Sequence, residues 1–155
     1  MKVLALDQST KITGWSLWDK NKLKEYGTVS SNIKENNPIE RMRQMYDEVC
    51  KLIDTKTPDF VIIEQVQFQK NYRTYSQLSQ MQGVLFSSLF ERNIGFTIIE
   101  STAWKKAMGV SGKNRAEQKA ATIQIVKMIY KVDTSEDEAD SIGMGHWAIQ
   151  NIISR

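Results

Sequence analysis

The sequence predicts an α/β fold in which one mixed β-sheet carries helices on its faces. Three observations predict it. Short continuous apolar runs at residues 3–6, 60–63 and 96–99 indicate buried strands. Alternating segments near the N-terminus indicate two further strands, and helical stripes of apolar side chains separate the later ones. A chain of 155 residues is about the length of one domain, so we expect residues 1–155 to form a single domain.

The first three strands form an antiparallel meander in this prediction. The run at residues 3–6 ends at Asp7 and lacks alternation, which is typical of a strand that is covered on both faces. Residues 15–18 alternate, and the polar residues 19–22 after them indicate a turn. Residues 23–29 then continue as the third strand.

From residue 38 onwards, helices and strands follow one another in turn. A helical stripe over residues 38–53, with Pro58 behind it as a breaker, precedes the buried strand 60–63. A second helical stripe over residues 75–89 precedes the buried strand 96–99. Such alternation adds parallel strands to the antiparallel meander and makes the sheet mixed.

After the last strand the sequence predicts helices alone. A Ser-Thr pair at residues 101–102 caps a short helix, and a basic loop follows at 109–114. A further helix covers residues 115–130, and a last helix covers residues 136–153.

The composition limits the classes of function. Lys and Arg number 21 against 18 Asp and Glu, and the formal net charge of +3 permits a nucleic-acid partner without requiring one. The single Cys50 excludes an internal disulfide and a cysteine cluster for zinc, and it suits a reducing cytoplasm. No apolar run approaches the roughly 18 residues of a membrane span, so we expect no membrane partner.

Four acidic residues fall where strands end or where a helix turns. Asp7 ends the first strand and Glu64 ends the strand at 60–63, and ligands in open α/β sheets bind beyond the carboxyl ends of strands. Asp137 and Asp140 are three residues apart and share a face of the last helix. If the two strands are parallel neighbours, the four acids could converge. For each acid alone, a helix cap or a solvated surface residue is the other interpretation, and for Asp137 alone it is the favoured one.

Clustered carboxylates point to metal chemistry. They repel one another and raise each other's pKa unless a cation neutralises them. Ligands that are all oxygen suit Mg²⁺ or Mn²⁺ rather than zinc. Two such ions about 3.5–4 Å apart suit phosphodiester hydrolysis, in which one ion activates water and the other stabilises the leaving oxygen.

The segments that carry these acids resemble RuvC-type Holliday junction resolvases of the RNase H-like (retroviral integrase) superfamily. The resemblance rests on Ala-Leu-Asp at 5–7, Thr-Gly-Trp at 13–15, Ile-Glu-Gln-Val at 63–66, Gln-Gly at 82–83 and Asp-Glu-Ala-Asp at 137–140. These segments occur in the family's order and span nearly the whole chain.

The resemblance implies an RNase H-like five-stranded mixed sheet flanked by helices on both faces. It implies a homodimer that binds branched DNA and nicks two opposing strands of a four-way junction, with one active site for each strand. It also implies two Mg²⁺ ions, for which Mn²⁺ substitutes, and a dimer interface formed largely by the helix after the second acid. The metal-binding and catalytic residues that it implies are Asp7, Glu64, Asp137 and Asp140.

Basic and aromatic residues alternate after the second acid, in a segment that we expect to be a loop. Lys70, Tyr72 and Arg73 belong to it, and such a mixture suits contact with the DNA backbone together with base stacking. The family often has an aromatic residue where this chain has Gln67, and Phe68 follows directly. We therefore expect Phe68 to stack on an unpaired base at the junction centre, with packing on the loop as the alternative.

A second basic cluster follows the last strand. It consists of Lys105, Lys106, Lys113, Arg115 and Lys119. The resemblance implies that one lysine here contacts DNA near the scissile phosphate; Lys105 matches best, and Lys106 is the near alternative. A solvated helix face is the other interpretation of each lysine.

Several alternatives stay open at this stage. The family often has Asp-Pro-Gly where this chain has Asp7-Gln8-Ser9, and this departure is typical of a divergent member. The chain could be encoded by a bacterium or by a phage, and in either case we expect it in the bacterial cytoplasm. A related nuclease could act on forks, flaps or RNA–DNA hybrids instead. Residues 7–10 with Gly14 resemble the first phosphate loop of actin-like ATPases, although those enzymes need two such domains. A DNA-binding module without catalysis is a further alternative, and dependence on a branch-migration motor is left open.

Overall fold

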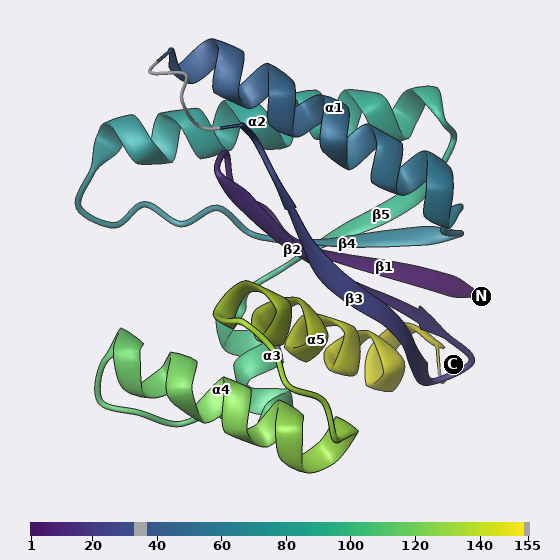
Figure 1. Cartoon of the computed structure of the whole chain (residues 1–155), viewed down its shortest axis with the longest axis vertical. Coiled ribbons are helices and arrows are strands. Elements are labelled where there is room, and N and C mark those ends of the chain that lie inside the picture. The colour runs from purple at the N-terminus through teal and green to yellow at the C-terminus, as the bar shows by residue number, and fades with distance from the viewer. Residues whose placement is uncertain (33–36, 154–155) are drawn as a thin grey trace.

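The computed structural model describes residues 1–32 and 37–153 (Figure 1). Five strands form one sheet in the order β3-β2-β1-β4-β5. The strands are β1 (Lys2–Asp7), β2 (Ile12–Asp19), β3 (Lys22–Ser30), β4 (Phe60–Glu64) and β5 (Gly95–Ile99). The first three pair antiparallel, whereas β4 pairs parallel with both β1 and β5. The predicted five-stranded mixed sheet is therefore confirmed.

Helices cover both faces of this sheet, as the sequence predicts (Figure 1). They are α1 (Pro38–Lys56), α2 (Tyr72–Glu91), α3 (Ser101–Met108), α4 (Arg115–Tyr130) and α5 (Glu136–Ala148). α1 and α2 lie on one face, and α3, α4 and α5 lie on the other. No helix in the part of the chain that the structure describes is long and apolar enough to cross a membrane.

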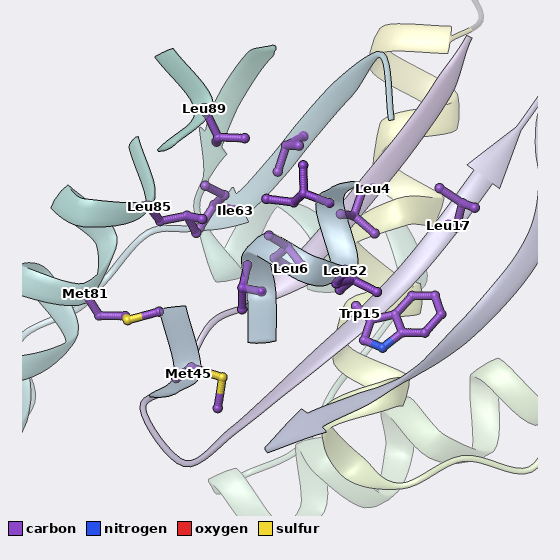
Figure 2. Packing of buried hydrophobic residues seen from close by; sticks show 13 residues of the cluster. Leu4, Leu6, Trp15, Leu17, Met45, Leu52, Ile63, Met81, Leu85 and Leu89 are labelled. Carbon is purple, nitrogen blue, oxygen red and sulfur yellow. The ribbon is translucent and has the colours of Figure 1, made fainter. Parts of the chain in front are cut away.

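Two hydrophobic cores lie on opposite sides of the sheet. Leu4 and Leu6 of β1 pack with side chains of α1 and α2, among them Met45 and Met81 (Figure 2). Val3 and Ala5 of the same strand point to the other face and pack against α3, α4 and α5. Side chains alternate across a strand, so a strand that is covered on both faces is apolar at every position. This explains the continuous apolar run that predicts β1.

The segment that carries Tyr72 and Arg73 is not a loop, and this prediction is wrong. Both residues lie in the first turn of α2, because the side chain of Asn71 caps that helix by accepting a hydrogen bond from the Thr74 amide at 3.2 Å. Asn is among the residues that favour this position, so the sequence did contain a mark of the boundary. Lys70 remains in the loop before the helix.

Two helix ends also differ from the prediction. The last α-helix ends at Ala148 and continues as a π-helix over Ile149–Ile153, in which Ile152 packs against the second core. Ser101 begins α3 rather than capping it, since Glu100 occupies the N-cap position; the Ser101 hydroxyl instead accepts a hydrogen bond from the Gln67 side chain at 3.3 Å.

Candidate active site

Asp7 and Glu64 end two adjacent parallel strands at the same edge of the sheet. Leu6 of β1 is paired in register with Ile63 of β4, so the acid that follows each of them occupies an equivalent position. The two strands are thus parallel neighbours, which is the condition under which the sequence lets the four acids converge. Carboxyl ends of parallel strands are the usual place for a ligand site in an open α/β sheet.

α5 brings the other two acids to this edge from the end of the chain. A capping box defines its first turn, in which the Ser135 amide donates to the Glu138 carboxylate at 2.7 Å and the Glu138 amide donates to the Ser135 hydroxyl at 3.3 Å. That turn packs directly on β2 because Gly14 has no side chain. A Cβ on Gly14 would lie 2.0 Å from the carbonyl oxygen of Asp137.

The four acids line one cavity of about 420 Å³, which we call the four-acid cavity. It is bounded by the ends of β1 and β4, by the N-terminal turns of α4 and α5, and by α3. A second cavity of about 620 Å³ adjoins it, shares Asp7, Glu64 and Arg115, and extends along the loop that carries Lys70. The four predicted acids, which come from the ends of β1 and β4 and from α5, therefore lie around one cavity.

Burial and mutual repulsion disfavour the charged forms of Asp7 and Asp140. Burial raises the pKa of Asp7 well above its usual range, and the charges of Glu64, Asp140 and Asp137 raise it further. Burial likewise raises the pKa of Asp140 to about 6, although the ammonium of Lys119 opposes the shift. Without a counter-charge, this cavity cannot hold four carboxylates at low cost.

The other two acids are shifted in the same direction. Burial raises the pKa of Glu64, while a hydrogen bond from the Trp104 indole and the charge of Lys105 oppose that shift. Burial also raises the pKa of Asp137, and Lys119 again opposes it. All four groups are thus more basic than ordinary surface carboxylates.

The donor set fits a hard divalent cation. Carboxylate oxygens are the ligands that Mg²⁺ and Mn²⁺ prefer, and a cation would relieve the repulsion that raises these pKa values. Within residues 1–32 and 37–153, no three Asp, Glu, His or Cys side chains stand ready as a preformed metal cluster. The four acids that line the cavity are the residues that would hold such a cation if one were bound.

Three residues of the predicted basic cluster reach the four-acid cavity. Lys105, Arg115 and Lys119 line it, whereas Lys106 and Lys113 are exposed and do not appear among its lining residues. Partial burial would lower the pKa of Lys119, but its bond to Glu136 at 2.6 Å and the nearby carboxylates raise it overall. Lys119 is therefore held as a cation beside the acids.

Among the aromatic residues after Glu64, Tyr75 lines the second cavity and Phe68 contacts Tyr75. Phe68 is 60% exposed and packs edge-to-face on Tyr75, with ring centroids 5.6 Å apart. Tyr72 is 73% exposed at the start of α2, and Arg73 beside it is exposed as well. Tyr75 lines the second cavity, so the exposed ring of Phe68 stands next to the opening that leads to the acids.

Sequence reasoning missed three residues that hold the site together. The Trp104 indole nitrogen donates to the Glu64 carboxylate at 3.0 Å, and the Gln82 side chain donates to the Glu64 carbonyl at 2.9 Å. The side chain of Gln8 donates to the Leu78 carbonyl at 3.0 Å and so ties the residue after Asp7 to α2. Gln82 belongs to a segment that resembles the family, but nothing in the sequence marked Trp104.

Comparison with known proteins relates the chain to nucleases. A family model described as crossover junction endodeoxyribonuclease RuvC matches residues 3–146. The chain is 30% identical over 154 residues to the protein of that name from Fusobacterium nucleatum, covering 93% of this chain and 77% of the relative. It is 29% identical over 150 residues to that of Finegoldia magna, covering 93% and 90%.

Solved structures share the fold. Thermus thermophilus RuvC in complex with a Holliday junction substrate matches with a TM-score of 0.76 at 15% identity, covering 96% of this chain and 93% of that one. The yeast mitochondrial Holliday junction resolvase matches with a TM-score of 0.65 at 14% identity, covering 96% and 79%.

Proposed function

Because the chain belongs to the RuvC family of crossover junction endodeoxyribonucleases, we propose that the four-acid cavity is its active site. The protein is a Holliday-junction-resolving endonuclease with an RNase H-like fold, of a family that depends on metal ions and serves DNA recombination and repair. The observation that carries the assignment of the site is the convergence of Asp7, Glu64, Asp137 and Asp140 on one cavity.

In this proposal the four acids bind two Mg²⁺ ions, for which Mn²⁺ substitutes. When bound, such ions activate water as the nucleophile and stabilise the leaving oxygen of the phosphodiester. The residues of the chain supply the negative charge that holds the cations, from rigid strand ends on one side and a capped helix turn on the other. Asp7 lies at the centre of this charge, since each of the other three acids raises its pKa.

Cationic side chains bind the scissile phosphate in the same cavity. Lys105 and Arg115 line the cavity together with the acids, so a phosphate group there would meet positive charge on the side of α3 and α4. Of the two lysines considered for this contact, Lys105 lies in the cavity and Lys106 is exposed outside it. Lys119 contributes a further positive charge, which lies close enough to Asp140 to oppose the rise in the pKa of that carboxyl.

The surface around the second cavity binds the branched DNA. Lys70 lines that cavity, and Arg73 is exposed in the first turn of α2. Lys106 on α3 and Lys113 before α4 are exposed as well, and these side chains supply positive charge for the DNA backbone. Phe68 and Tyr72 present exposed rings on which an unpaired base could stack. We propose that Phe68 performs this role at the junction centre.

α2 provides the surface for a homodimer. Val84 and Phe90 are 41% and 69% exposed on its outer side, and a Cβ on Gly83 would meet no atom within 4 Å. Gly83 and Phe90 are seven residues apart and lie on one stripe, and Val84 lies beside Gly83 on the same exposed side. Phe90 also packs on Phe96 of β5, with ring centroids 5.5 Å apart. A twofold pairing of this stripe would present two active sites to two opposing strands.

We further propose that residues 1–155 act as one nuclease domain and that the protein works where branched DNA is found. For a bacterial or phage protein that place is the cytoplasm of the bacterial cell. This rests on the class of its substrate.

A nicking assay tests the proposed function. A fixed four-way junction, a Y-fork and an RNA–DNA hybrid are incubated side by side with Mg²⁺ or Mn²⁺, and we expect paired nicks in opposing strands of the junction. Asp7→Asn should abolish nicking, whereas Asp133→Asn, at an exposed carboxylate that pairs with Lys127, should retain it. Preference for the fork or the hybrid would favour the alternative nuclease, and full activity of Asp7→Asn would remove Asp7 from the mechanism.

A further inference from the structure

Trp104 is a large aromatic residue with its whole side chain buried at the edge of a charged cavity. It lies in α3, is 0% exposed and lines the four-acid cavity. Its indole nitrogen donates a hydrogen bond to Oε2 of Glu64 at 3.0 Å. An indole has a single N–H and a carboxylate has two oxygens, so this bond occupies one oxygen of Glu64 and leaves the other for a second partner.

The same ring also contacts the helix that carries the other acids. A Cβ on Gly143 would lie 2.7 Å from the Cε3 and Cζ3 atoms of the Trp104 indole, so the ring lies directly against the α5 backbone. Gly143 is three residues after Asp140, which is about one helical turn. Trp104 therefore touches the backbone of α5 with one edge of its ring system and Glu64 with its nitrogen.

We propose that Trp104 is a positioning residue for metal-dependent cleavage, which orients the Glu64 carboxylate and sets its distance from the turn of α5 that carries Asp140. This inference rests on the proposed role of Glu64 as a metal ligand. A group that hydrogen-bonds one oxygen of a metal-binding carboxylate fixes its orientation, and loss of such a group lowers metal affinity or activity by about 10–100-fold.

The chain contains a matched control for this residue. Trp18 is also 0% exposed and also packs on α5, where a Cβ on Gly145 would lie 1.8 Å from its indole nitrogen. Its indole nitrogen, however, donates to the hydroxyl of Ser16 at 2.9 Å and not to an acid. Trp18→Phe therefore removes an indole N–H and changes the packing on α5 without touching Glu64.

The first experiment needs no change at Trp104. In a ¹H–¹⁵N spectrum of the protein, the indole resonance of Trp104 should move when Glu64→Gln replaces the charged acceptor with a neutral one, because hydrogen bonds to charged groups are stronger. The resonance of Trp18 should stay in place. A Trp104 resonance that does not move in Glu64→Gln would overturn the inference.

The second experiment measures metal binding directly. Mn²⁺ is titrated calorimetrically into wild type, Trp104→Phe and Trp18→Phe, with the folded fraction of each checked by circular dichroism. We expect Trp104→Phe to bind Mn²⁺ about 10–100-fold more weakly and to nick a four-way junction more slowly at saturating DNA. Trp18→Phe also disturbs α5, because the Ser16 hydroxyl that Trp18 hydrogen-bonds donates in turn to the Ser141 carbonyl, so this variant measures that disturbance alone. It should bind Mn²⁺ more tightly and nick faster than Trp104→Phe. Equal Mn²⁺ affinity and equal nicking rates in the two variants would overturn the inference.

Failure of this inference is distinct from failure of the proposed function. If Glu64→Gln is inactive while Trp104→Phe behaves as wild type, Glu64 keeps its proposed role and Trp104 loses its own. If Glu64→Gln nicks junctions at the wild-type rate, the proposed role of Glu64 fails, and the positioning role of Trp104 fails with it.

Discussion

Gly14 on β2 lies directly against the backbone of Asp137, so close that a Cβ would come within 2.0 Å of the Asp137 carbonyl oxygen. The two residues are far apart in the sequence, yet this contact determines how near the first turn of α5 comes to the sheet. The bond from the Ser16 hydroxyl to the Ser141 carbonyl, at 2.7 Å, joins the same strand to the same helix one turn later. Together these contacts hold Asp137 and Asp140 over the ends of β1 and β4.

Gly14→Ala should therefore separate α5 from β2 and inactivate the site. Overpacking of this kind typically destabilises a protein by about 1–3 kcal/mol, and we expect junction nicking to fall at least about 100-fold, since misplacement of reacting groups by about 1 Å is enough for such a loss. Chemical unfolding and the nicking assay measure the two effects. Gly83→Ala is the control for stability alone, because a Cβ there meets no atom within 4 Å but the position lies on the proposed dimer surface; an equal loss of stability in both variants would contradict the explanation.

Asp140→Asn should stabilise the metal-free protein at neutral pH. Burial raises the pKa of Asp140 from 3.8 to about 6, so the folded protein binds more protons than the unfolded chain between these values. Wild-type stability therefore falls as pH rises through this window, and above it the variant should be more stable by about 1–3 kcal/mol. Thermal unfolding in a chelator at pH 4 and pH 7 measures the difference, which should vanish at the lower pH.

An exposed ion pair between Asp54 and Arg92 provides a control for the predicted gain in stability of Asp140→Asn. A hydrogen bond from Arg92 lowers the pKa of Asp54, which is the direction opposite to that of Asp140. Asp54→Asn should thus lower stability at pH 7, where Asp140→Asn raises it. Stabilisation by both substitutions would show that general loss of acidic charge, and not repulsion in the four-acid cavity, is responsible.

Divalent metal should stabilise the folded protein through the same four acids. A ligand that binds only the folded state at 100 times its dissociation constant adds about 2.7 kcal/mol. In a domain of this length, each kcal/mol of added stability raises the Tm by about 2–4 °C. We therefore expect Mg²⁺ or Mn²⁺ to raise the Tm of wild type by several degrees. Asp7→Asn should lose most of this rise while remaining folded in chelator, and an undiminished rise would place the metal elsewhere.

Phe68→Ala should weaken action on junctions without changing metal binding. Stacking of a base on an aromatic side chain contributes about 1–3 kcal/mol, so we expect junction affinity to fall about 5- to 150-fold. Fluorescence anisotropy with a labelled junction in Ca²⁺ measures the affinity, and Mn²⁺ calorimetry checks the site. Phe68→Tyr keeps a stacking ring and should bind as wild type; a loss equal to that of Phe68→Ala would argue against stacking.

Val84→Glu should disrupt the proposed homodimer. The Val84 side chain is 41% exposed on the outer face of α2. In a twofold dimer through this face, the introduced glutamate would be buried next to the same glutamate of the partner subunit. Light scattering should show a monomer, and paired nicks in opposing strands should give way to single ones. Ile129→Glu changes a residue of similar exposure, 44%, on α4, on the other side of the sheet, and should leave the mass unchanged.

The sequence by itself predicted the order of the strands and helices and the four acids proposed for the active site, although α2 begins and α5 ends elsewhere than predicted. Each strand and helix has a local period of apolar side chains, and local periods depend only on neighbouring residues. Asp7 and Glu64 could be placed at strand ends, and Asp137 and Asp140 on one helix face, for the same reason. Even the misplaced start of α2 carried a local mark in Asn71, whose side chain caps the helix.

Contacts between distant elements were decided by the tertiary structure alone. Trp104 and Glu64 are 40 residues apart, and no period in the sequence relates an indole on α3 to a carboxylate at the end of β4. Only packing decides that Lys105 reaches the four-acid cavity while Lys106 beside it does not, because one turn of helix directs neighbouring side chains to different sides. The acids define the chemistry that the chain can perform, and the close packing of α3 and α5 against the sheet defines where they meet.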